Sequence, residues 1–129
     1  MPQRIFRIAL PLSVLAALPL LAHHSIPSHY FMDQGVHLEG EIKDFAYQNP
    51  HSMLRVEAKD PRTGEMVDWI VEWGPVRRLK DRGVTKDSVK PGDHVVIDGY
   101  PSRDNLDHQI FLRGISRPSD GWKSGRDIR

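Results

Sequence analysis

The sequence predicts an all-β fold in the main: a small five-stranded OB-like barrel with one short helix between strands 3 and 4. Apolar and polar residues alternate in five segments, which is the periodicity of strands with one buried face. Between the third and fourth segments, the stretch from Pro75 to Gly83 has helical spacing instead. Three strands, a helix and two strands is the element order of an OB-type barrel, and an open meander is the alternative topology.

The first alternating segment begins at Val36 and changes register near its end. Val36, Leu38 and Ile42 fall on one face, whereas the next apolar positions, Phe45 and Tyr47, fit only if the alternation slips by one residue. A β-bulge at residue 43 or 44 accounts for this slip and would bend the strand as a small barrel requires.

The other four expected strands cover residues 52–58, 66–73, 94–100 and 109–116. In the third strand, Trp69 and Trp73 share one face, so we expect them in the core rather than in a carbohydrate platform. In the fifth strand, strict alternation puts Ile110 and Leu112 opposite Ile115.

The expected helix has recognisable start and stop signals. Pro75 fits the first helical position, and Gly83 fits the position just after the last turn. Residues 90–93 (KPGD) then place proline and glycine where a type II turn needs them, directly before the fourth strand.

Composition limits the classes of protein that the chain can belong to. Its 129 residues fit one domain, with 18 Lys and Arg against 17 Asp and Glu, and no Cys. The absence of Cys excludes disulfides, thiolate zinc sites and cysteine nucleophiles. The small net charge of +1 argues against nucleic acid as a partner. No phosphate-binding loop, dinucleotide fingerprint, zinc-protease motif or nucleophile elbow is present, so the sequence indicates no catalytic residue and favours a non-enzyme.

Residues 1–22 have the pattern of a signal peptide. Arg4 and Arg7 precede an apolar run over residues 8–21, which is too short to span a bilayer, and Ala22 is the expected cleavage position. We therefore expect a periplasmic or secreted protein with no stable membrane span after cleavage. An uncleaved membrane anchor is the alternative. The mature chain is expected to consist of an extended arm over residues 23–35, the barrel domain over residues 36–116 and a polar tail over residues 117–129.

Histidines are concentrated where a metal could be held. Cleavage after Ala22 would give His23 a free α-amine beside its ring Nδ1, and a further imidazole would complete a set of three nitrogens, which suits Cu(II). His24 offers an alternative set with the same metal, made of the amine, the intervening amide and its own ring. His51 is the candidate distant ligand, because the Asn49-Pro50 turn fixes its backbone, and the Met53 thioether would favour Cu(I). The alternative for His51 is a hydrogen-bonding role, which is the more common one after a turn, and the alternative for an exposed His23-His24 terminus is weak copper binding without a biological role.

Five segments together resemble one family. They are AHHS at residues 22–25, FAYQNPH at 45–51, WIVEWGP at 69–75, RLKDRGV at 78–84 and KPGDHVVIDGYP at 90–101. The chain resembles a family of small exported bacterial proteins classed as a domain of unknown function. The resemblance implies export, a single β-rich domain, and marker positions at His23, His24, Asn49, Pro50, His51 and Glu72. It departs from the family at Val84, where a tryptophan usually follows the glycine.

Two functions follow from these observations. The first is a periplasmic copper-binding protein, a carrier or sensor, with His23, His24 and His51 as ligands and Glu72 as an oxygen ligand or as a partner that orients an imidazole. The second is a metal-free binding module, in which the barrel face or the loop over residues 101–108 engages a peptide, a glycan or another envelope partner.

Overall fold

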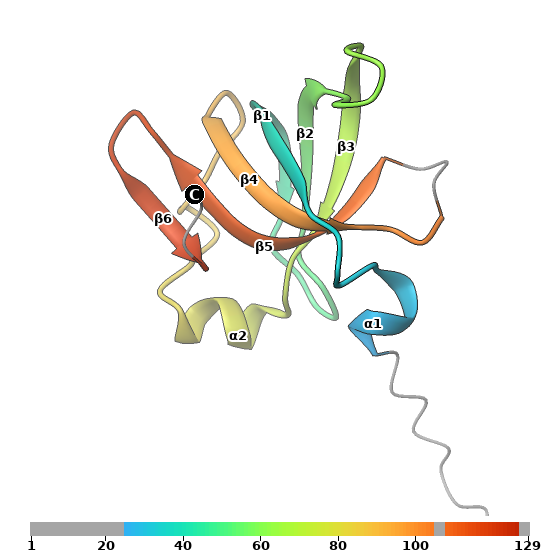
Figure 1. The fold of residues 1–129 in the computed structure, drawn as a ribbon. Coiled ribbons are helices and arrows are strands. Elements are labelled where there is room, and N and C mark those ends of the chain that lie inside the picture. The colour runs from blue at the N-terminus through green and yellow to red at the C-terminus, as the bar shows by residue number, and fades with distance from the viewer. Residues whose placement is uncertain (1–24, 105–107, 127–129) are drawn as a thin grey trace, which may run out of the picture.

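The computed structural model describes residues 25–104 and 108–126 of the chain. Two short helices and six strands make up the fold (Figure 1): α1 (Ile26–His29), β1 (Val36–Ala46), β2 (Met53–Lys59), β3 (Met66–Glu72), α2 (Val76–Asp81), β4 (His94–Pro101), β5 (Gln109–Arg117) and β6 (Trp122–Gly125). The expected signal peptide, and His23 and His24 with it, lie outside the described residues. Among the described helices, none is long and apolar enough to cross a membrane.

The first five strands close into an OB-like barrel. The sheet order is β3-β2-β1-β4-β5-β6, and β3 additionally pairs with β5 in parallel, with Ile70 opposite Gln109 and Glu72 opposite Phe111. This parallel pairing joins the two ends of the five-stranded sheet, so the open-meander alternative is wrong. Closure removes the unpaired edges that β3 and β5 would otherwise present.

The expected bulge in β1 is confirmed. The register with β2 shifts between Ile42 and Asp44, and the apolar alternation before that point puts Leu38, Gly40 and Ile42 on the buried face. Gly40 allows the strands to approach closely here, because a Cβ at this position would lie 2.1 Å from the carbonyl oxygen of Glu57.

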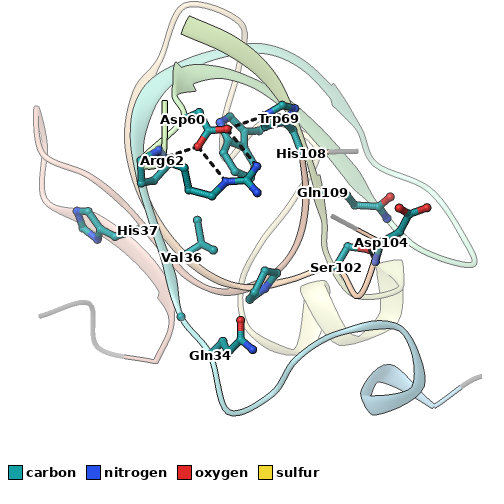
Figure 2. A pocket seen from close by; sticks show the side chains of 13 residues that line it. Gln34, Val36, His37, Asp60, Arg62, Trp69, Ser102, Asp104, His108 and Gln109 are labelled. Atoms are coloured by element: carbon teal, nitrogen blue, oxygen red, sulfur yellow. Dashed lines mark hydrogen bonds and ion pairs between the residues drawn. The ribbon is translucent and has the colours of Figure 1, made fainter. Parts of the chain in front are cut away.

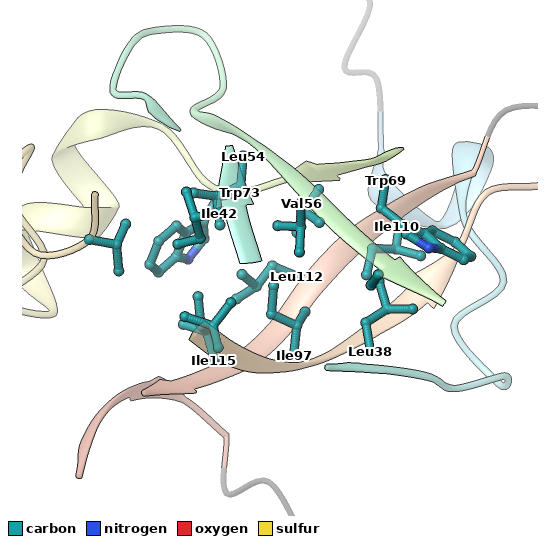
Figure 3. Packing of buried hydrophobic residues seen from close by; sticks show 14 of the residues in the cluster. Leu38, Ile42, Leu54, Val56, Trp69, Trp73, Ile97, Ile110, Leu112 and Ile115 are labelled. Carbon is teal, nitrogen blue, oxygen red and sulfur yellow. The ribbon is translucent and has the colours of Figure 1, made fainter. Parts of the chain in front are cut away.

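The core fills the inside of the barrel (Figure 3). Trp69 and Trp73 are 5% and 2% exposed and belong to it, as their alternation predicts. The other buried apolar residues of the cluster are Leu38, Ile42, Leu54, Val56, Ala58, Val71, Leu79, Val84, Val89, Val95, Ile97, Ile110, Leu112 and Ile115. Val84, the position where the family that the chain resembles usually has tryptophan, is therefore buried.

Ile115 lies in this core, so the prediction that it faces away from Ile110 and Leu112 is wrong. The cause is a second bulge: Leu112 pairs with Gly99 of β4, but Gly114 pairs with Asp98, which leaves Arg113 as an extra residue. The extra residue reverses the alternation, because a shift by one position moves all later side chains of a strand to the other face.

The helix and the turn that follow β3 match their sequence signals closely. We expected Pro75 at the first helical position, and the structure places it one position earlier, as the N-cap of α2. Gly83 follows the C-cap residue and has a left-handed φ of 73°. The turn over residues 90–93 has Gly92 at φ 91° and a hydrogen bond from Asp93 N to Lys90 O, as a type II turn requires.

The structure differs from the expectations at both ends of the barrel domain. The expected extended arm contains α1. Pro27 is compatible with this helix because it stands in the first turn, where a backbone N–H has no intrahelical hydrogen-bond partner to lose. Tyr30, directly after α1, is 3% exposed and forms a β-bridge with Ser102. The expected polar tail contains β6, which pairs with β5 and packs Trp122 against the core.

Candidate functional site

The Asn49-Pro50-His51 turn is fixed to the start of α2. The side-chain Oδ1 of Asn49 accepts a hydrogen bond of 3.1 Å from Val76 N, which satisfies one of the free N–H groups at the helix start. The Asn49–Pro50 peptide bond is cis. Ser52 is fully buried, and its backbone exchanges hydrogen bonds with Gly74 O and Trp73 N. These contacts give His51 a defined backbone position, as we expected from the turn.

His51 and Glu72 lie side by side at one end of the barrel. The antiparallel pairing of β2 with β3 places Met53 opposite Glu72. His51 is two positions before Met53 and therefore lies at the same end of the barrel as Glu72. There Nδ1 of His51 is in direct contact with Oε1 of Glu72, and a neutral imidazole with its proton on Nδ1 donates a hydrogen bond to the carboxylate. The Glu72 side chain is only 13% exposed, whereas the His51 side chain is 46% exposed. The carboxylate is thus the inner partner and the imidazole the outer one.

The second carboxylate oxygen of Glu72 is held by Tyr30. The Tyr30 hydroxyl donates a hydrogen bond to Oε2 of Glu72 and accepts one of 2.7 Å from Nε2 of Gln109. Burial, followed by the hydrogen bond and negative charge of Glu72, raises the pKa of Tyr30 despite the opposing hydrogen bond from Gln109. The phenol therefore stays protonated and remains a donor to the carboxylate at any physiological pH.

This network leaves one ring nitrogen of His51 available. With Nδ1–H directed at Glu72, a neutral imidazole carries its lone pair at Nε2. Within residues 25–104 and 108–126, the contact with Glu72 is the only polar one that the ring makes. Such a nitrogen can bind a metal ion, accept a hydrogen bond from a ligand or take up a proton.

The available nitrogen belongs to a groove that α1 also lines. The groove has a volume of about 530 Å³, and one wall consists of the arm, including Ile26 and His29. The remaining lining residues are Ser28, Tyr30, His51, Glu72, Ser102, Arg103, Asp104 and Gln109. The arm therefore folds back onto the end of the barrel that carries His51.

Of the four metal ligands that the sequence predicts, the structure brings His51 and Glu72 together. His23 and His24 lie outside the described residues. Within the described part of the chain, no group of three or more His, Asp or Glu side chains converges closely enough to hold a metal ion. Both oxygens of Glu72 are already engaged, so its geometry matches the orienting role rather than that of a direct oxygen ligand.

Sequence reasoning missed Tyr30 and Gln109. Tyr30 stands in a segment without strand or helix periodicity, and Gln109 reaches the network only because β5 closes the barrel against β3. The signal that could have pointed to Tyr30 is its position: it is an aromatic residue only a few positions after His23 and His24.

Three other histidines take part in separate ion pairs. His37 pairs with Asp98 and His94 with Glu39, both across the exposed face of β1 and β4. Nε2 of His108 lies 2.7 Å from Oδ2 of the buried Asp60, within hydrogen-bond distance. None of these three histidines is among the predicted metal ligands, and each contacts a carboxylate.

Asp60 forms the centre of a second cavity, of about 360 Å³, beside the loop after β4 (Figure 2). Its carboxylate is 1% exposed and accepts hydrogen bonds from the backbone and side chain of Arg62, and it also contacts Nε2 of His108. Trp69 packs edge-on against the His108 ring with the ring centroids 5.0 Å apart. Because the carboxylate is fully paired, this cluster is best explained as a structural tie between the β2–β3 hairpin and the start of β5.

One comparison with known proteins gives a match. Residues 12–111 match the model of a family of unknown function, DUF6152, and the chain therefore belongs to that family. No curated protein and no solved structure matches the chain.

Proposed function

For this member of the family of unknown function DUF6152, we propose the role of an exported copper-binding protein, a carrier or sensor, that holds the metal at the groove beside α1. The ligands are Nε2 of His51 and nitrogen atoms of His23 and His24. The observation that carries the proposal is the contact between Nδ1 of His51 and the recessed carboxylate of Glu72, which leaves Nε2 for a metal ion.

A histidine that binds a metal through one ring nitrogen usually donates a hydrogen bond from the other nitrogen to a carboxylate, a backbone carbonyl or water. The carboxylate fixes the tautomer and the orientation of the ring, and it makes the opposite nitrogen a better ligand. In this chain the arrangement is reinforced from behind, because Tyr30 and Gln109 hold the carboxylate in turn. Both His51 and Glu72 are positions that the family resemblance singles out.

The chain length supports the participation of the two preceding histidines. Ile26 lines the groove, and each residue of an extended chain adds at most about 3.6 Å. His24 precedes Ile26 by only two residues, so the chain is short enough for its ring to reach the groove. Removal of a signal peptide after Ala22 would add the α-amine of His23 to the set of nitrogen donors.

The donor set favours copper over the other common metals. The chain has no Cys, so a thiolate zinc or iron–sulfur site cannot form. Three nitrogen donors that include a terminal amine suit the tetragonal geometry of Cu(II).

Isothermal titration calorimetry with Cu(II) tests the proposal. The protein is purified from the envelope of cells that express the full chain, its N-terminus is checked by mass analysis, and a His-His-Ser peptide serves as the reference. We expect the protein to bind one Cu(II) more tightly than the peptide does, and His51→Ala to reduce the affinity about tenfold or more. The matched control is His94→Ala, which removes an exposed, carboxylate-paired histidine outside the groove and should leave copper affinity unchanged. Equal affinity of the wild-type protein and the peptide would overturn the proposal.

A further inference from the structure

A second groove is lined by α2 and the β5–β6 hairpin and shares no lining residue with the groove of the histidine site. Figure 1 shows α2 and β6 on one side of the barrel and α1 on the other. The second groove has a volume of about 650 Å³, which is within the range of pockets that hold small organic ligands. One bank is α2 and the other is the β5–β6 hairpin. Its lining residues are Met32, Trp73, Gly74, Arg78, Leu79, Arg82, Tyr100, Phe111, Leu112, Arg113, Lys123, Ser124, Gly125 and Arg126.

The groove concentrates positive charge without any lining carboxylate. Arg78 and Arg82 stand on the helix bank, and Arg113 and Arg126 stand on the hairpin bank. Within the described part of the chain, none of these four guanidinium groups has an Asp or Glu within ion-pair distance, whereas Arg55, Arg62 and Arg117 each do. The whole chain is nearly neutral, so this local excess is not a consequence of composition.

Backbone geometry brings the hairpin arginines together. Arg113 is the extra residue of the β5 bulge, and its carbonyl oxygen accepts a hydrogen bond of 3.1 Å from Arg126 N. Gly125 makes this approach possible: its φ is 93°, and a Cβ there would lie 2.5 Å from Arg113 O. Bulges often redirect a side chain beside a functional site. Here the bulge of β5 places Arg113 opposite Arg126, which directly follows β6.

The helix bank carries two arginines. Arg78 lies within α2 and Arg82 is its C-cap residue, and both side chains are exposed. Both border the groove, so an anion bound between the banks would lower the repulsion between their charges.

The floor of the groove is apolar but contains unsatisfied polar atoms. Trp73, Leu79 and Leu112 are buried in it, and Met32 at its edge is 40% exposed. Nε1 of Trp73, a residue only 2% exposed, and Oγ of Ser124 are buried without a hydrogen-bond partner in the described structure.

We propose that this groove binds a small single-chain amphiphilic anion, a carboxylate or phosphate attached to an alkyl chain. The head group pairs with guanidinium groups from both banks, since arginine matches the planar geometry of carboxylate and phosphate oxygens. The alkyl chain packs against the partly exposed side chains of Met32, Tyr100 and Phe111, which line the groove. The volume of the groove limits the ligand to one such molecule.

Titration calorimetry with sodium decanoate and with decyl phosphate, both below their micelle concentrations, tests the proposal. The protein is purified from cells expressing the full chain, and copper is removed beforehand so that the histidine site contributes nothing. We expect both amphiphiles to bind with one molecule per chain, and the affinity to fall as salt concentration rises. Decyltrimethylammonium, which has the same chain and the opposite charge, should not bind, and inorganic phosphate should bind much more weakly than decyl phosphate. The two anionic probes also distinguish the head groups, since a free fatty acid would be the source of one and a single-chain phospholipid of the other.

The double variant Arg78→Gln/Arg113→Gln removes one guanidinium from each bank. Because both side chains are exposed, the fold should persist, and we expect affinity for both amphiphiles to fall about tenfold or more. The matched control is Arg77→Gln/Lys86→Gln, which removes the same charge from exposed positions outside the groove. The proposal is overturned if the control loses as much affinity as the test variant, if the cationic amphiphile binds equally well, or if neither anionic amphiphile binds.

Discussion

The imidazole of His51 and the carboxylate of Glu72 are in direct contact, and the carboxylate is recessed whereas the imidazole faces the groove beside α1. The two residues are 21 positions apart in the chain, and the pairing of β2 with β3 brings them to the same end of the barrel. The affinity of His51 for a ligand at Nε2 therefore depends on the Glu72 carboxylate, which orients the ring without contacting the ligand.

Glu72→Gln should weaken copper binding by about 10- to 100-fold, the usual effect of losing the partner that orients a metal-binding imidazole. The amide retains the size of the side chain but not its charge. Cu(II) titration calorimetry measures the affinity, and Glu39→Gln is the control, because Glu39 forms a similar ion pair with His94 on the exposed face. An unchanged affinity in Glu72→Gln would show that Glu72 does not orient a copper ligand.

Tyr30→Phe should destabilise the metal-free protein by about 1–3 kcal/mol. The substitution leaves Oε2 of Glu72 and Nε2 of Gln109 without their shared partner at a buried position. Urea unfolding in the presence of a chelator measures the free energy of unfolding. Tyr47→Phe is the control with a smaller expected loss, since the Tyr47 hydroxyl donates one hydrogen bond, to Val84 O, and leaves no charged group unpaired. Equal losses in the two variants would contradict the network.

Asp60 should make the protein lose stability in acid. Hydrogen bonds from the side chain and backbone of Arg62, together with the contact to His108, lower the pKa of this carboxyl group below its ordinary value, although burial opposes the shift. A carboxyl group whose pKa is lower in the folded state stabilises the fold above the ordinary Asp pKa of about 3.9. That stabilisation is lost as the pH falls from there toward the folded-state pKa.

Urea unfolding of wild type and Asp60→Asn between pH 7 and pH 3 measures this effect. The variant should be less stable than wild type at pH 7, and the difference should shrink as the pH falls below about 4. Asp68→Asn is the control, because Asp68 forms an exposed ion pair with Arg55, which contributes about 0–1 kcal/mol. A constant difference between wild type and Asp60→Asn over the whole range would contradict the assignment.

The barrel could be predicted from the sequence because its main signals are local. Alternation identified the five strands, the shift after Ile42 identified the first bulge, and Pro75 and Gly83 bounded α2. The short β6 carries no such signal, because it is polar and pairs on one side only. The helical turn α1 carries no such signal either, because four residues are too few to show a helical period, and Pro27 in its first turn does not break it.

The candidate site could be predicted only in part. His51 could be selected from its place after the Asn49-Pro50 turn, and Glu72 from the family resemblance. Their contact depends on the register of β2 and β3, and the contacts of Tyr30 depend on barrel closure and on the arm folding back. These contacts join residues 42 and 79 positions apart, and no local periodicity encodes them.

Ile115→Ala measures the consequence of the second bulge. With Arg113 as an extra residue, Ile115 is fully buried with Leu112, and its truncation should cost about 2–5 kcal/mol, as for other large aliphatic core residues. Without the bulge, Ile115 would face solvent and the change would stay within about 0.5 kcal/mol. Urea unfolding distinguishes these outcomes, and Ile70→Ala, on the half-buried face of β3, is the control with a smaller expected loss. Because the same bulge places Arg113 beside Arg126, a near-neutral result for Ile115→Ala would also remove the geometric basis of the basic groove.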